Sequence, residues 1–308
     1  MRIGINGNRL VRPGNLEAIV EHARGARRDG IASYWLAQDP TGSCDALTAL
    51  TIVATRVPEI ELATGVVPTW PRHPAALAAQ ALTVNQASRG RLTLGIGLSH
   101  RAMMESVLGI PFERPIRHMK DYLSILAPLL EKGSVDYQGE SASCHTTMDR
   151  IESRGPALLV AALGPQMLRL AGSHADGTVV TFTGPKTIRD HIKPTLERAA
   201  EEAGRPRPRL AAIFSLCVTD DVEGARERAD EWFERHGHAP SYDAMLEREG
   251  VTRASDIQLL GDEAEIERRF EELAEIGVDE IVVGESAVTP EEAERTRAHL
   301  ITMAEKLA

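Results

Sequence analysis

Residues 61–100, ELATGVVPTWPRHPAALAAQALTVNQASRGRLTLGIGLSH, contain one complete strand–helix–strand unit. The apolar run over residues 60–67 is shorter than an ordinary helix and is typical of a strand, and a proline-rich loop follows it. Apolar residues then recur at helical spacing over residues 77–84 and at every second position over residues 92–96. Two parallel strands need such a crossover, so the stretch predicts a βαβ unit.

The same alternation of strand-like and helical segments runs along the whole chain. Further strands are predicted at residues 3–5, 33–36, 157–162, 178–181, 210–218 and 281–283. Helices are predicted at residues 16–23, 45–55, 116–130, 165–172, 188–203 with Gly204 as cap, 222–249, 266–274 and 290–306. Eight strands separated by helices, without a change of composition, favour a single (β/α)8 TIM barrel over residues 1–308. Residues 133–155 are polar and irregular, which predicts an insert that forms a hairpin or excursion.

A doubly wound open sheet is the alternative architecture. Such folds usually carry a G-x-G-x-x-G turn after the first strand or a phosphate-binding G-x-x-x-x-G-K-[ST] loop, and the chain has neither. The sequence therefore favours the barrel.

Composition restricts the partners of this chain. It has 308 residues, of which 43% are hydrophobic, so it can bury a large core. The formal net charge of −10 argues against a surface for nucleic acid or an anionic membrane. Cys44, Cys144 and Cys217 lie far apart without metal-ligand spacing and predict reduced thiols. Because no apolar run is long enough to cross a membrane and no signal peptide precedes the first strand, we expect a cytoplasmic protein.

Barrel active sites form where the strands end, so those positions are the candidates for chemistry. The strand ends are Asn6, Gln38–Asp39, and residues 64–67, 98–100, 163–167 and 181–183. This set has no pair of carboxylates, no G-x-S-x-G and no H-E-x-x-H, so a glycosidase or a metal hydrolase is poorly supported. Its glycines, hydroxyls and single histidine suit a large cofactor that is held mostly by backbone.

Two features of this rim have a functional and a structural interpretation. Gly164-Pro165-Gln166-Met167 follows a strand and opens a helix, which is typical of an anion site but also of an ordinary βα turn. His100 ends the fourth strand and is either a proton donor or a hydrogen-bonded structural residue. The pair His236 and His238 lacks a third ligand, so we expect it on the surface, and no metal site is predicted.

Several segments resemble the luciferase-like monooxygenase superfamily, and more narrowly its actinobacterial oxidoreductases that depend on coenzyme F420, a deazaflavin. They are TGVVPTWPRHP (64–74), GRLTLGIGLSH (90–100), VLGIPFERPIRHMKDYL (107–123), LVAALGPQMLRLAG (159–172) and ADGTV (175–179). The resemblance implies a barrel with the deazaflavin across its C-terminal face, usually in a homodimer. It implies a bulge with a non-proline cis peptide at Gly65–Val66 behind the ring, and cofactor phosphate at the 164–167 turn. Asp39 matches an acidic position near the polar edge of the ring, and Thr64 and Ser99 are further candidates for contact with the cofactor.

The chain departs from the sugar-phosphate dehydrogenases of this superfamily. Those enzymes have a histidine after the aspartate at strand two and a glutamate after strand four, where this chain has Pro40 and His100. Lys186 matches a lysine that grips the sugar phosphate there only with a two-residue offset. Glucose-6-phosphate is therefore not the expected substrate.

The function that the resemblance implies is hydride transfer between C5 of the deazaflavin and a small organic substrate. We expect His100 to supply the proton, because an ordinary histidine pKa of about 6.5 suits an acid at neutral pH. Asn6, Thr181 and Lys186 are the candidates for substrate contact. Two alternatives stay open: a monooxygenase of the same superfamily that uses flavin mononucleotide (FMN), and a cofactor-binding protein without turnover.

Overall fold

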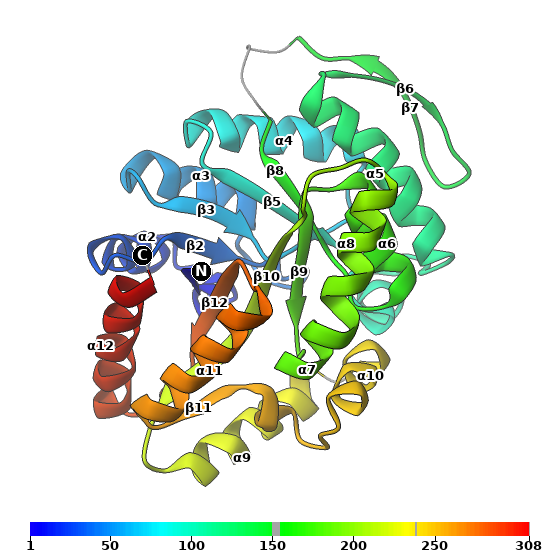
Figure 1. Cartoon of the computed structure of the whole chain (residues 1–308). Coiled ribbons are helices and arrows are strands. Elements are labelled where there is room, and N and C mark those ends of the chain that lie inside the picture. Colours follow the sequence, from blue (N-terminus) through cyan, green and yellow to red (C-terminus); the bar gives the residue numbers. More distant parts are fainter. Residues whose placement is uncertain (150–154, 238, 308) are drawn as a thin grey trace.

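The strands of the computed structural model, which describes residues 1–149, 155–237 and 239–307, close into a parallel barrel (Figure 1). In the described part, the barrel strands are β1 (Arg2–Asn6), β2 (Ser33–Leu36), β3 (Glu61–Thr64), β5 (Leu92–Gly97), β8 (Ala157–Ala161), β9 (Gly177–Thr181), β10 (Arg209–Val218) and β12 (Glu280–Glu285). They pair in this order, and β12 pairs with both β10 and β1, which closes the ring. The predicted TIM barrel is confirmed.

Helices cover the outside of the barrel and part of the face at which its strands end. They are α1 (Asn8–Val11), α2 (Leu16–Arg28), α3 (Ala46–Arg56), α4 (Pro74–Ala87), α5 (Pro115–Glu131), α6 (Pro165–His174), α7 (Pro185–Thr187), α8 (Lys193–Glu202), α9 (Val222–Trp232), α10 (Pro240–Glu249), α11 (Glu263–Ile276) and α12 (Pro290–Leu307). There are also short helical turns. Those of π type are η1 (Met103–Val107), η2 (Ile188–Ile192) and η3 (Phe233–Gly237), and the 3-10 turn is η4 (Ala254–Ile257). None of the helices described is long and apolar enough to span a lipid bilayer.

Two predicted helices are divided in the structure. The segment predicted as a helix at 188–203 consists of the π-helical turn η2 and then α8, and the short helix α7 directly precedes it. Pro194 at the start of α8 explains the division, because proline has no N–H to donate and its ring crowds the preceding turn. Gly204 comes directly after Ala203, the C-cap of α8, and its φ of 65° is the left-handed conformation that terminates a helix. The helix predicted at 222–249 is divided into α9, η3 and α10.

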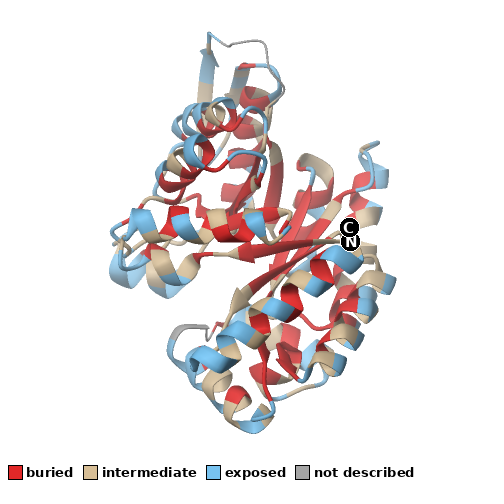
Figure 2. Ribbon diagram, turned by 90° about the vertical axis from the view of Figure 1, so that its left-hand side faces the viewer, coloured by how far each residue is buried: buried red, intermediate tan, exposed pale blue. Residues whose placement is uncertain are grey.

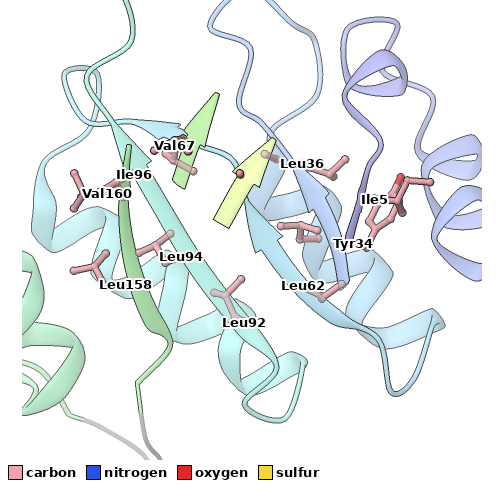
Figure 3. Packing of buried hydrophobic residues seen from close by; sticks show 14 of the residues in the cluster. Ile5, Tyr34, Leu36, Leu62, Val67, Leu92, Leu94, Ile96, Leu158 and Val160 are labelled. Atoms are coloured by element: carbon pink, nitrogen blue, oxygen red, sulfur yellow. The ribbon is translucent and has the colours of Figure 1, made fainter. Parts of the chain in front are cut away.

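Strand residues alternate between two apolar cores. Outward-facing side chains pack beneath the helices, and Figure 3 shows Leu92, Leu94 and Ile96 of β5 in this outer layer. Inward-facing Trp35, Ala63 and neighbouring side chains fill the barrel itself. Because both faces are covered, the strands are buried along their length, whereas the helices are buried on one side only (Figure 2).

A buried ion pair lies where the strands begin. Glu280, the first residue of β12, has no exposed surface and pairs with Arg209, the first residue of β10. Ser33 and Trp35 of β2 donate hydrogen bonds to the same carboxylate. Trp35 thereby joins this ion pair to the opposite end of the barrel, since its ring also lies beneath Gly65.

Strands β6 (Ser134–Gln138) and β7 (Ser143–Thr147) form the antiparallel hairpin that was expected within residues 133–155. The hairpin packs on α5, at the end of the molecule opposite to α9 and α10 (Figure 1). The remaining residues of this predicted insert, 150–154, lie outside the described part of the chain.

Candidate active site

A cavity of about 690 Å³ lies at the carboxyl ends of the barrel strands. It is lined by the ends of β1, β9, β10 and β12, by His100 after β5, and by residues of α9 and α10. Four of the residues predicted for the site lie on its wall: Asn6, Gly65, His100 and Thr181. The structure therefore brings together a proton-transfer candidate, a backbone bulge and two polar side chains.

The bulge after β3 forms one wall of the cavity. The Gly65–Val66 peptide bond is cis, as the sequence resemblance implied. Backbone hydrogen bonds from Gly65 N to Leu36 O and from Gln38 N to Val66 O tie the bulge to β2, both at 3.0 Å. Beyond it, the short strand β4 (Val67–Pro68) pairs with β5. The bulge is thus fixed on both sides.

Thr64 holds this bulge rather than facing the cavity. Its side chain is fully buried, and its hydroxyl both accepts from Gly95 N and donates to Gly95 O, each at 2.8 Å. The hydroxyl of Thr64 is therefore engaged with the neighbouring strand, and the contact of Thr64 with a cofactor stays a prediction.

Two glycines of β5 make room for the bulge. A Cβ on Gly95 would lie 2.0 Å from the carbonyl oxygen of Thr64, and a Cβ on Gly97 would lie 2.8 Å from a methyl of Val66. The alternate glycines in the sequence LGIG therefore reflect close approach of backbone, because no side chain fits between β5 and the bulge.

Alanine at Gly95 should lower the free energy of unfolding by about 2–3 kcal/mol, since the clash is with backbone and no rotamer relieves it. Gly25, inside α2, is the matched control. A Cβ there would meet its nearest atom at 3.5 Å, an ordinary contact, so Gly25→Ala should stabilise the protein by about 0.5–1 kcal/mol. Urea unfolding of both variants measures the two changes in stability. Destabilisation of equal size would contradict the conclusion that Gly95 is required by the close approach of the bulge.

His100 lies beside Tyr242 of α10, with ring centroids 5.3 Å apart in an edge-to-face arrangement. Burial disfavours the imidazolium and lowers the pKa of His100 below its ordinary value. The neutral imidazole is therefore favoured more strongly than in an unperturbed histidine, so His100 is protonated at a lower pH than the ordinary pKa predicts. Burial likewise raises the pKa of Tyr242 to about 12, so its hydroxyl stays protonated.

A hydrogen-bonded network that the sequence analysis missed reaches the opposite side of the cavity. Glu285, at the end of β12, contacts His22 Nε2 at 3.3 Å and accepts from Arg297 Nη1 at 3.2 Å. His22 Nδ1 lies 3.2 Å from the hydroxyl of buried Tyr34, and Arg297 also pairs with Asp29 at 2.7 Å. Burial alone would raise the pKa of Glu285, but His22 and Arg297 outweigh it and lower that pKa. Glu285 thus presents a charged carboxylate to the cavity.

The start of α6 is open to solvent. Gly164, Pro165 and Gln166 are exposed, and a Cβ on Gly164 would meet no atom within 4 Å. No described side chain caps the helix, so the first-turn backbone N–H groups of Gln166 and Met167 face outward at its positive end. The side chain of Met167 is buried in the outer core. This helix start can hold an anion, beside the described cavity rather than on its wall.

Three other predicted residues lie outside the cavity lining. Asp39 pairs with Arg12 at 3.2 Å and accepts from Thr41. Burial alone would raise the pKa of Asp39, but these donors outweigh it and lower that pKa. Ser99 has a left-handed backbone with a φ of 60° at the end of β5. Lys186 is exposed on α7, where its backbone N–H donates to Glu249.

No group of three or more metal-ligating side chains occurs among the described residues. His238 and the side chain of His236 lie outside that part of the chain, so their predicted surface position stays a prediction.

A family model described as luciferase-like monooxygenase matches residues 4–300. The chain belongs to this family. The match spans all eight barrel strands except the first two residues of β1, so the family assignment covers the whole candidate site.

Relatives of this luciferase-like protein include a reductase and a dehydrogenase, and the dehydrogenase is named as F420-dependent. A 5,10-methylenetetrahydromethanopterin reductase of Methanolobus tindarius is 25% identical over 296 residues, 86% of this chain and 89% of the relative. An F420-dependent glucose-6-phosphate dehydrogenase of Microbacterium testaceum is 29% identical over 233 residues, 73% of this chain and 67% of the relative.

Solved structures of the same fold include enzymes with different cofactors. The coenzyme F420-dependent tetrahydromethanopterin reductase of Methanopyrus kandleri aligns with a TM-score of 0.75 and 22% identity over 99% of this chain and 97% of its own. The oxygenating constituent of 3,6-diketocamphane monooxygenase from Pseudomonas putida, in complex with FMN, aligns with a TM-score of 0.76 and 18% identity over 100% and 98% of the two chains. At these identities the structures of the luciferase-like family establish the fold alone.

Proposed function

We propose that this protein is a coenzyme F420-dependent oxidoreductase that transfers a hydride between C5 of the deazaflavin and a small organic substrate. The observation that carries the proposal is the Gly65–Val66 bulge, which presents backbone rather than a side chain to the cavity and is held between β2 and β5. A flat ring can lie against such a surface. Curated relatives named as F420-dependent support the deazaflavin.

The residues present fit this cofactor. The bulge would support the ring, and the open start of α6 would hold its phosphate through backbone N–H groups. When bound, the deazaflavin supplies the hydride chemistry. The protein's own contribution is to orient the substrate with Asn6 and Thr181, to exclude water, and to exchange a proton at His100. Asp39, Ser99 and Lys186 stay predictions, as do the homodimer, the cytoplasmic location, and the absence of nucleic-acid and membrane partners.

The FMN-dependent alternative rests on a specific observation, since an FMN complex shares the fold. Titration with each cofactor while tryptophan fluorescence is recorded separates the two. Trp232 lines the cavity and Trp35 lies 3.0 Å from the Cβ position of Gly65, so a bound ring should quench both. Trp70 instead stacks on His118 with centroids 3.7 Å apart and serves as a background signal.

We expect F420 to bind with a micromolar dissociation constant and at least about tenfold more tightly than FMN. A charge placed at the start of α6 tests the phosphate site. Gln166→Glu should weaken F420 binding about tenfold, because the new carboxylate offsets the positive potential at the start of the helix and repels the phosphate. Gln80→Glu on the exposed face of α4 is the matched control and should leave binding unchanged. Preference for FMN would favour an oxygen-using flavoenzyme instead. Binding of neither cofactor would refute both the F420-dependent and the FMN-dependent function.

A further inference from the structure

Aromatic side chains gather on one side of the cavity. Only 4% of the chain is aromatic, yet Phe182, Trp232 and Tyr242 all line this cavity. Phe182 lies 4.7 Å from Tyr242 and 6.3 Å from Trp232, measured between ring centroids. We call these three residues the aromatic wall.

The wall is held in place from behind. Phe233, Leu246 and Ile257 form a buried cluster against which Phe182 and Tyr242 pack. Phe182 also contacts Phe233 directly, with centroids 4.9 Å apart. Phe182 directly follows β9, and the other residues come from α9, η3, α10 and η4. The wall is therefore built where the excursion between β10 and β11 (Leu259–Gly261) meets the barrel. Such backing keeps the wall formed before any ligand arrives.

Two energetically unfavourable features of the wall, a strained backbone and an exposed indole, indicate that a ligand covers it. Phe182 follows the last residue of β9 with a φ of 53°, a left-handed backbone that bulky residues rarely adopt. Conformations of this kind persist where the surroundings enforce them, and they cluster at ligand-binding positions. Trp232 leaves 51% of its surface exposed, although an indole gains free energy when it is buried.

We propose that the aromatic wall binds a flat aromatic ring of the substrate. The inference deepens the proposed function, since it names the substrate class of the same site: aromatic compounds whose reducible or oxidisable group points toward His100. His100 lies next to the wall, because its ring packs edge-to-face on Tyr242. A substrate ring on the wall would therefore bring its reactive group close to the imidazole. Aromatic rings prefer offset or edge-to-face neighbours and gain affinity from them beyond what buried area provides. A saturated ring of equal size gains affinity only from the apolar area that it buries.

Binding of 2-acetylnaphthalene and of its saturated counterpart 2-acetyldecalin tests the proposal. Both carry the same carbonyl group on a bicyclic body, so the comparison isolates aromaticity. Isothermal titration calorimetry is performed on the protein saturated with oxidised F420, where no turnover occurs. We expect the aromatic ketone to bind about tenfold more tightly, and Trp232→Leu and Phe182→Leu each to reduce that ratio about three- to fivefold. Phe112→Leu removes a ring that packs at a tilt against Trp70, outside the cavity lining, and should leave the ratio unchanged.

Several outcomes overturn the proposal. Equal affinity for the two ketones would do so, as would an unchanged ratio in both wall variants or a lower ratio in Phe112→Leu. The titration is repeated on the cofactor-free protein, and an aromatic ketone that binds there but not to the F420-saturated protein would assign the wall to the cofactor instead. The cofactor titration is independent of this result: a protein that binds neither F420 nor FMN but still prefers the aromatic ketone would refute the proposed function and leave the wall supported.

Discussion

Replacing Glu280 with alanine should lower the free energy of unfolding by about 3–5 kcal/mol, the usual cost of removing one partner of a buried ion pair. The carboxylate has no exposed surface, and Arg209, its partner, is largely buried as well. Without Glu280, the guanidinium keeps its desolvation cost and loses its counter-charge. Ser33 and Trp35 also lose an acceptor, although the 2.8 Å bond between them remains. Urea unfolding at pH 7 measures the effect.

A double variant separates the contribution of the ion pair to stability from the contribution of side-chain packing. Glu280→Leu combined with Arg209→Met removes both charges and keeps apolar bulk, so it should recover most of the stability lost in Glu280→Leu alone. If the double variant is as unstable as the single one, the ion pair is not the source of the effect, and loss of packing around β12 would be the explanation instead.

The barrel could be predicted from the sequence because its strands are buried on both faces. Short apolar runs such as residues 157–162 and 210–218 are too short for helices and lie between helical segments, which restricts the fold to parallel α/β architectures. The glycines of β5 were visible in the sequence, but their purpose was not. Only the structure shows that Gly95 and Gly97 face the bulge after β3.

The position of the hairpin could also have been deduced. Residues 134–147 follow helix α5 and precede strand β8, and loops that lead from a helix to a strand lie at the amino end of a barrel. The hairpin therefore lies away from the cavity, and none of its described residues lines it. The polar sequence of residues 133–155 predicts an excursion at this place in the chain, and the order of the connections is what places it at the amino end of the barrel.

The aromatic wall and Glu285 were missed for different reasons. Glu285 ends a predicted strand, so the rule that strand ends form the site would have found it if the last strand had been inspected. Trp232 and Tyr242 lie on helices whose charged sequence is typical of a solvated surface. Helical periodicity does not say against which part of a barrel an excursion packs, so these two residues required the structure.

The largest expected effect on catalysis is at His100. His100→Ala should lower kcat by about 10²–10³-fold, the usual contribution of a positioned acid or base, and should leave F420 affinity within about twofold of the original. The reason is geometric: the imidazole lies on the cavity wall, and no described residue hydrogen-bonds to its nitrogens, so it is available to substrate. Steady-state kinetics with reduced F420 and the fastest carbonyl substrate from a screen measure the first quantity, and fluorescence titration measures the second.

The pH dependence tests the same assignment independently. Burial lowers the pKa of His100, so the protonated form that donates to a reduced substrate predominates only at a lower pH than in an unperturbed histidine. In the direction of substrate reduction, kcat should therefore fall as pH rises through that lowered pKa, and in the direction of oxidation it should rise and then level off. Both pH dependences should vanish in His100→Ala and persist in His145→Ala, a histidine exposed on β7. Equal losses of turnover and cofactor affinity, or an unchanged pH profile, would show that His100 supports the structure instead of moving the proton.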